Sequence, residues 1–199
     1  MNTTIREATP ADTALILGFI RALAEFERAP GEVTATEEGL LRDGFGGNPF
    51  YYCLIAEHDG RPAGFAFYFF NYSTWKGRPG IYLEDLFVHP EFRGLGIGKA
   101  LLQRVAAIAV EKGCERMQWE VLDWNTPAID FYRAMGADFL DEWRNVRLDG
   151  EALRRLAEGA DSVTAQPGES DAIPPFRQKT DERMGHGGKS IEPQAEAAP

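Results

Sequence analysis

The sequence predicts a mixed α/β domain in which helices flank a mostly antiparallel central sheet. The predicted order of elements is a strand, two helices, three strands, a helix, a strand, a helix, a strand and a closing helix. Two of the strands flank a four-residue turn, which makes them an antiparallel hairpin. The 199 residues suffice for one core with an appendage but not for two full domains.

The first two helices are predicted from their capping signals. Residues 9–12 combine an N-capping threonine, a proline at the first helical position and an aspartate two residues later. Apolar residues then recur at helical spacing from Leu15 to Phe26. We expect a second helix from Thr34 or Thr36 to the glycine-rich segment 44–47.

The middle of the chain predicts a meander followed by a helix. Residues 51–57 and 63–72 are rich in aromatic and branched side chains and flank the turn 58–61, and residues 81–88 supply a third strand. Apolar residues at helical spacing predict a helix over 99–112, and Gly113 follows as a stop.

The last predicted elements are shorter. Residues 116–122 read as a strand, and Asn125 opens a helix that ends at Gly136. Residues 139–148 resemble a strand, and residues 151–158 are expected to form the closing helix.

The composition changes after about residue 160. Residues 162–199 hold five prolines and one aromatic residue, Phe176, without sustained periodicity. Such a segment cannot bury enough apolar surface to offset its ordering entropy. We therefore expect an N-terminal domain over 1–161 and a disordered polar tail over 162–199, with docking of the tail onto a partner as the alternative.

Charge and cysteine content limit the classes of function. The net charge is −10 and most of it lies in residues 1–161, which disfavours nucleic-acid binding through a broad basic face. Cys53 and Cys114 lie in apolar runs, so we expect free thiols, no disulfide and no metal site. The start of the chain lacks a leader pattern and no run approaches the ~18 apolar residues of a membrane span, which predicts a cytoplasmic protein without membrane association.

A glycine-rich segment gives the strongest chemical signal. Residues 86–99 pass from a strand through a turn with alternating glycines directly into a helix, so backbone N–H groups and the positive helix end converge. We interpret this as an anion cradle. The segment is one residue short of the Walker A spacing, has Ala100 at the magnesium-binding position, and misses the Rossmann spacing. The alternative is that the glycines serve only a tight turn.

The Arg-x-x-Gly-x-Gly pattern at residues 93–98 resembles the acyl-CoA pyrophosphate loop of the GNAT N-acetyltransferases. The chain is similar to the diamine (spermidine/spermine) branch of that superfamily over roughly residues 4–158. Further matching stretches occur in the same order at residues 43–46, 48–51, 82–85 and 124–132. The tail has no matching counterpart.

This resemblance implies acetyl-CoA as the cosubstrate, without a metal, in a cleft between the strand that ends at Val88 and the strand 116–122. Arg133 is an expected contact for an outer phosphate, or else a surface arginine. The implied cofactor-binding residues are Leu86, Phe87, Val88, Arg93, Gly94, Leu95, Gly96, Ile97, Gly98, Lys99, Asn125, Pro127 and Arg133.

The reaction needs a proton acceptor and a proton donor. An alkylamine with a pKa of ~10.4 is almost entirely protonated at pH 7, and the leaving thiolate has a pKa of ~8.5. By the resemblance, Glu84 is the expected base, with Asp85 as the next choice, and Tyr132 is the expected acid. Alternatively, Glu84 is an ion-pair partner and Tyr132 fills the helix–sheet interface. The acetyl group passes directly to the amine, so neither cysteine acts as a nucleophile.

The resemblance implies a small cationic amine as the acceptor (a diamine, a polyamine, or a lysine-like amine such as thialysine), and a surface lined by carboxylates would attract such an amine. Glu120 stands where the family pattern is apolar and Gln118 where it has histidine, which leaves the amine open. Acetylation of a protein or antibiotic amine, or a non-catalytic acyl-CoA-binding module, are the alternatives. The resemblance also implies a homodimer. By the resemblance, the expected substrate-facing residues are Phe26, Glu27, Glu84, Asp85, Gln118, Trp119, Glu120 and Glu142, with Asp141 as the alternative to Glu142.

Overall fold

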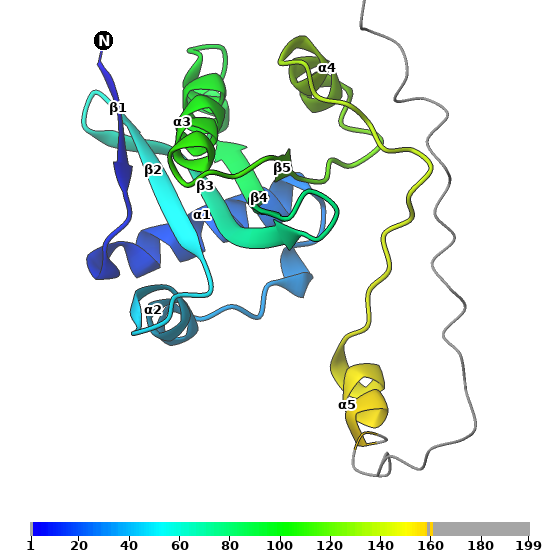
Figure 1. Ribbon diagram of the computed structural model, residues 1–199. Helices are drawn as coiled ribbons and strands as arrows, with labels where there is room; N and C mark the ends of the chain where they lie inside the picture. Colours follow the sequence, from blue (N-terminus) through cyan, green and yellow to red (C-terminus); the bar gives the residue numbers. More distant parts are fainter. Residues whose placement is uncertain (1, 159, 161–199) are drawn as a thin grey trace, which may run out of the picture. The chain divides into compact units, whose positions relative to one another are not determined.

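A computed structural model describes residues 2–158 and residue 160. The chain divides into two units after Asp138 (Figure 1). The predicted tail, 162–199, lies outside the described residues, so its disorder stays a prediction. Among the described residues no helix is long and apolar enough to cross a bilayer.

The first unit is built on a five-stranded sheet in which the strands follow one another in chain order. β1 to β4 pair antiparallel, and β5 pairs parallel with β4. The predicted mixed, mostly antiparallel sheet is therefore confirmed. The strands are β1 (Thr3–Glu7), β2 (Tyr52–His58), β3 (Arg61–Ser73), β4 (Arg78–Val88) and β5 (Met117–Gln118).

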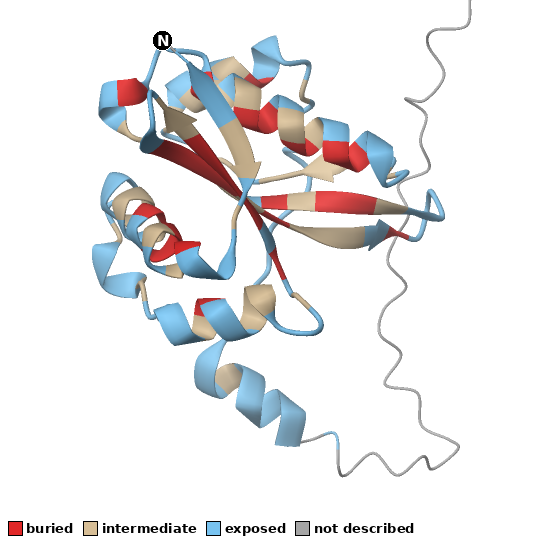
Figure 2. Cartoon of the chain, turned by 90° about the vertical axis from the view of Figure 1, so that its left-hand side faces the viewer, coloured by how far each residue is buried: buried red, intermediate tan, exposed pale blue. Residues whose placement is uncertain are grey.

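Helices cover both faces of this sheet. α1 and α3 lie on opposite faces, and the buried residues gather along the sides that these elements turn toward each other (Figures 1 and 2). On the α1 face, Phe19 stacks on Phe65 with ring centroids 5.2 Å apart. The helices of this unit are α1 (Thr13–Phe26), α2 (Glu37–Phe45), α3 (Ile97–Glu111) and α4 (Thr126–Ala134), with 3₁₀ turns at Pro10–Asp12, Pro30–Glu32 and Pro90–Phe92.

Local signals explain where most elements begin and end. Thr36 caps α2 by accepting a hydrogen bond from the N–H of Gly39 at 3.1 Å, and Asn125 caps α4. Asp59 and Gly60 both have positive φ, 48° and 76°, as a two-residue hairpin turn between right-twisted strands requires. Both cysteines are free, as predicted.

One predicted strand is shorter than expected and another is wrong. The strand expected over 116–122 is reduced to Met117–Gln118, because its pairing with β4 covers only two positions. The strand expected over 139–148 is not formed; these residues open the second unit and have no strand partner among the described residues. The closing helix is present as α5 (Gly150–Glu158), and Leu153 and Leu156 on it are exposed. The helix expected to start at Lys99 begins two residues earlier.

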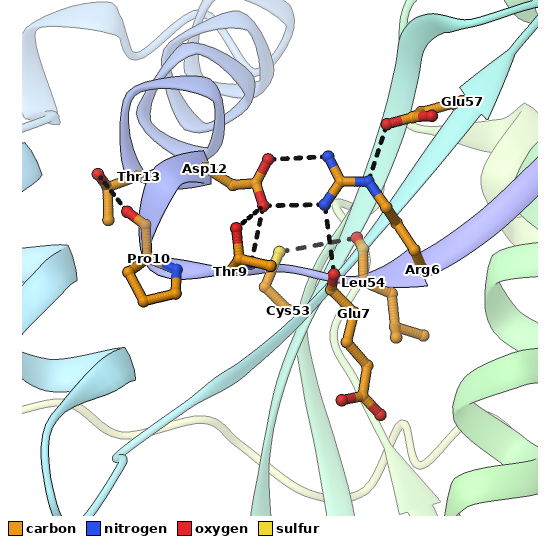
Figure 3. Close-up of polar contacts among 9 residues, drawn as sticks. All are labelled: Arg6, Glu7, Thr9, Pro10, Asp12, Thr13, Cys53, Leu54 and Glu57. Atoms are coloured by element: carbon orange, nitrogen blue, oxygen red, sulfur yellow. Dashed lines mark hydrogen bonds and ion pairs between the residues drawn. The ribbon is translucent and has the colours of Figure 1, made fainter.

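A polar network joins β1, β2 and the start of α1 (Figure 3). The Arg6 guanidinium donates to both carboxylate oxygens of Asp12 at 2.8 Å and to Oε1 of Glu57 at 2.8 Å. The N–H and hydroxyl groups of Thr9 also donate to Asp12. Asp12 is buried, and the hydrogen bonds from Arg6 hold its pKa far below the ordinary value. The network satisfies a buried charge at the edge of the sheet.

We expect Asp12→Asn to lower the free energy of unfolding at pH 7 by about 2 kcal/mol, because Arg6 loses the two-pronged ion pair with Asp12 and keeps only Glu57 as a charged partner. The pKa of Asp12 is lower in the folded protein than in the unfolded chain, where it is about 3.9. Its ionised carboxylate therefore stabilises the fold above that pH, and this contribution is lost as the pH falls toward the folded-state pKa. Urea unfolding at pH 7 and pH 3 should show a wild-type advantage that shrinks at pH 3. Asp43→Asn, in the exposed pair with Arg42, is the matched control and should change stability much less. An equal loss in both variants contradicts the assignment.

Candidate active site

The glycine-rich loop enters α3 with the backbone of an anion cradle. Gly94 and Gly96 have φ values of 80° and 78°, and a Cβ at either position would meet nothing within 4 Å. Glycine is therefore required by the backbone conformation rather than by crowding. Gly96 is the N-cap of α3, and no described side chain caps the N–H groups of the first turn. These groups and the positive helix end suit an anion.

Arg93 connects this loop to its surroundings. Its Nε donates to the carbonyl oxygen of Val88 at 3.0 Å. The guanidinium carbon lies 4.8 Å from the ring centroid of Phe26 and 5.8 Å from that of Phe87. Arg93 therefore links the loop to the end of β4 and to the end of α1. Pyrophosphate binding by Arg93 stays a prediction, and Lys99, also predicted to bind it, is exposed.

A bulge in β4 sets Glu84 apart from the ladder. Phe67 of β3 pairs with Asp85, whereas the next residue, Tyr68, pairs with Leu83, so Glu84 is the extra residue. Glu84 is exposed and Asp85 is half-buried. Two consecutive carboxylates are thus presented where the strand is locally distorted.

Carboxylates from three parts of the first unit influence one another. Burial, and then the charges of Glu84 and Glu27, raise the pKa of Asp85 to about 7. Burial, and then the charge of Glu120, raise the pKa of Glu84. The pKa of Glu27, at the end of α1, is raised by burial. Their repulsion is a cost that a cation would relieve.

Tyr82 belongs to the same group, although sequence reasoning did not assign it to the site. Its hydroxyl donates to Oε1 of Glu120 at 2.8 Å, and its ring stacks on Phe69 with centroids 5.2 Å apart. Burial, and then this hydrogen bond, raise the pKa of Tyr82. The spacing of two between Tyr82 and Glu84 on a strand could have indicated a shared face.

Tyr132 projects from α4 into a buried position, 8% exposed, with its ring centroid 5.1 Å from that of Trp119. Burial raises its pKa to about 12, so the phenol keeps its proton at neutral pH. Asn125 positions α4 by accepting a hydrogen bond from the N–H of Ala128, and Pro127 lies in the first turn. A phenol that stays protonated can donate a proton to a leaving group.

Contacts between arginine side chains and aromatic rings join the end of α1 to the segment before α4. Phe26 lies 5.8 Å from Trp124, centroid to centroid, and the guanidinium carbon of Arg28 lies 5.0 Å from the Trp124 ring. Arg93 contacts the Phe26 ring, as described above. Sequence reasoning missed Arg28 and Trp124 as site neighbours, because the positive φ of Arg28, 63°, has no sequence signature.

The other predicted residues lie in different settings. Gln118 accepts a hydrogen bond from Asn71 at 3.4 Å, and Arg133 is exposed with Asp130 at 3.7 Å. Asp141 and Glu142 belong to the second unit, so the structure does not place them with the site. A separate cavity of about 650 Å³, lined by Tyr52, Tyr68, Phe70 and Arg104 among others, contains none of the predicted site residues. Among the described residues no cluster of His, Cys, Asp and Glu suits a metal ion.

Comparison with known proteins gives consistent matches. Residues 18–137 match the acetyltransferase (GNAT) family. A thialysine N-epsilon-acetyltransferase of Bos taurus is 48% identical, with 77% of this chain and 96% of the relative covered. An L-ornithine N5-acetyltransferase of Arabidopsis thaliana is 33% identical, with 76% of this chain and 86% of the relative covered.

Solved structures show the same fold. An integron cassette protein of Vibrio cholerae superposes with a TM-score of 0.67 at 26% identity, with 79% of this chain and 99% of that chain covered. An aminoglycoside acetyltransferase from an uncultured soil metagenomic sample superposes with a TM-score of 0.61 at 20% identity, with 74% and 95% covered. The second likeness concerns the fold alone.

Proposed function

Because this chain belongs to the GNAT family and is an N-acetyltransferase, we propose that it transfers the acetyl group of acetyl-CoA to a primary amine of a small cationic acceptor. The observation that carries this proposal is the group of carboxylates around the β4 bulge, in which partial burial and neighbouring negative charges raise the pKa of both Glu84 and Asp85. A positively charged amine is the partner that such a group favours.

The loop fits acetyl-CoA, which the family uses. Gly94 and Gly96 leave open space where a side chain would otherwise project, and the first turn of α3 offers N–H groups to a phosphate. Residues 93–99 would hold the pyrophosphate, and Leu86, Phe87 and Val88 would contact the cosubstrate through their backbone. Asn125 and the start of α4 would line its pantetheine arm.

The proposed reaction is a direct attack of the neutral amine on the thioester. Glu84 takes the proton that the amine must lose, directly or through water, because a raised pKa makes its carboxylate a stronger base. Tyr132 gives a proton to the departing thiolate. Backbone N–H groups near Phe87 and Val88 steady the oxyanion. The carbon–nitrogen bond forms first and gives the tetrahedral oxyanion; the carbon–sulfur bond breaks as this intermediate collapses to the amide and the thiol, and Cys53 and Cys114 take no part.

The relatives support an acceptor that carries more than one charged group. They are named as enzymes acting on thialysine and L-ornithine, and another, from Homo sapiens, is named a spermidine/spermine N1-acetyltransferase-like protein. We therefore propose a thialysine-like amino acid, a diamine or a polyamine as the acceptor. The homodimer and the cytoplasmic location stay predictions.

The test is release of the coenzyme A thiol with thialysine, ornithine, putrescine, spermidine, an aminoglycoside and a lysine peptide, each with and without enzyme. We expect turnover that depends on the amine, with kcat/KM at least about tenfold higher for the small free amines than for the peptide. Turnover with the aminoglycoside or the peptide, but with none of the small free amines, would refute the proposed acceptor class. Release of thiol at the same rate without any amine would refute acetyl transfer.

A further inference from the structure

We infer that Glu120 is a positioning residue for Glu84, held beside it by the hydroxyl group of Tyr82. This inference rests on the proposed function, because it concerns how Glu84 performs as a base. Tyr82 donates to Oε1 of Glu120 at 2.8 Å, and Glu84 lies two residues beyond Tyr82 on the same strand. The hydrogen bond therefore fixes a second negative charge near the proposed base.

The position of the bond along the sheet gives it this role. The ladder between β4 and β5 consists of the pairs Ile81 with Met117 and Tyr82 with Gln118, and it ends there. Glu120 follows Gln118 by two residues, beyond the last backbone pair between β4 and β5. Beyond the backbone pairs, the side-chain hydrogen bond from Tyr82 to Glu120 therefore keeps the segment after β5 attached to β4.

Tyr82 is suited to hold the carboxylate because its own ring is fixed. The ring stacks on Phe69, its partner across the β3–β4 ladder, with centroids 5.2 Å apart and planes inclined by 23°. A stacked ring of this kind loses little further freedom when its hydroxyl makes a hydrogen bond. A hydrogen bond to an ionised carboxylate is stronger than one between neutral groups, and it leaves the negative charge on Glu120.

The charges around Glu84 identify Glu120 as the one that acts on it most directly. On its own strand Glu84 adjoins Asp85, and Glu27 at the end of α1 acts on Asp85. From the chain after β5, Glu120 is the charge that raises the pKa of Glu84, after burial. A nearby negative charge makes a carboxylate a better proton acceptor, which favours removal of a proton from the amine.

The experiment compares the pH dependence of kcat for wild type, Glu120→Gln, Tyr82→Phe and the control Glu115→Gln, with saturating acetyl-CoA and thialysine. Glu120→Gln keeps an oxygen that accepts from Tyr82 but removes the charge. Because the pKa of Glu84 then falls, the acidic limb of the profile should move to lower pH by about half a pH unit, and the plateau kcat should fall about threefold. Glu115 is exposed and precedes β5, so its variant should match wild type.

Tyr82→Phe keeps the stacked ring and removes only the hydrogen bond. It should shift the limb in the same direction by a smaller amount, because Glu120 keeps its charge but is less well fixed. A limb that stays at the wild-type pH in Glu120→Gln overturns the inference, as does an equal shift in Glu115→Gln. Thermal unfolding of each variant keeps a folding defect from being taken for either result.

The two proposals fail in different ways. If wild type acetylates none of the amines, the proposed function fails. If wild type acetylates thialysine and the four profiles superpose, only the positioning role of Glu120 fails, and the acceptor chemistry stands.

Discussion

Glu84→Gln should lower kcat for amine acetylation by about 100-fold at pH 7, the size expected when a general base is lost. Glutamine is nearly isosteric with glutamate, and Glu84 is the exposed bulge residue of β4, so the fold should be retained. The affinity for acetyl-CoA should stay unchanged, because the proposed contacts to the cosubstrate lie elsewhere. Initial rates of thiol release, measured over a range of amine concentrations, separate the effect on kcat from the effect on KM.

The same measurement distinguishes the base from an ion-pair partner. If Glu84 only attracts the cationic amine, the variant raises KM for the amine and leaves kcat at saturation near the wild-type value. The rate of Glu84→Gln should also recover as pH rises, because a larger fraction of the amine is then neutral without assistance. Glu38→Gln, an exposed glutamate in α2, serves as the charge-matched control. An unchanged kcat in Glu84→Gln would exclude the proposed base.

Tyr132→Phe should also lower kcat by about 100-fold, because the departing thiolate loses its proton donor. The phenylalanine ring can keep the packing against Trp119, so the variant removes the hydroxyl group alone. With a pKa raised to about 12, the phenol of wild type stays protonated through neutral pH, and the deficit should persist across pH 6–9. Steady-state kinetics with thialysine at several pH values provide the measurement.

Stability measurements complete the test of Tyr132. An unchanged kcat with a lowered midpoint of thermal unfolding would make Tyr132 a packing residue in the interface between α4 and its neighbours. Tyr72→Phe, which removes the hydroxyl of an exposed tyrosine in β3, is the matched control and should leave both quantities unchanged.

The parts of the fold that the sequence predicts are those controlled by local chemistry. The cap and proline at residues 9–12, the hairpin turn at Asp59 and Gly60, and the cap at Asn125 each act within a few residues, and the structure has the expected helix or turn at each place. The strand over 116–122 is shorter than predicted and the strand over 139–148 was wrong, because a strand exists only where a neighbour pairs with it. Propensity within the segment carries no information about that neighbour.

In the candidate site, too, features set by the local sequence are predictable, whereas contacts between distant residues are not. The glycines of the loop are visible in the sequence because their backbone conformation demands that residue type. The bulge at Glu84, the bond between Tyr82 and Glu120, and the contact of Arg93 with Phe26 all join residues that are brought together by the sheet and α1. The resemblance to a family indicated Glu84 and Tyr132, but it could not indicate Glu120 as a partner of Tyr82, since the family pattern is apolar there.

The most direct test of the central claim is one turnover with acetyl-CoA labelled in the acetyl group, mixed with enzyme and thialysine, quenched, and examined by mass spectrometry. The account predicts that the label appears on the amine of thialysine in step with thiol release, while the enzyme itself gains no mass. Label that accumulates on the protein, or is released as acetate while thialysine stays unmodified, would contradict direct acetyl transfer to a small amine.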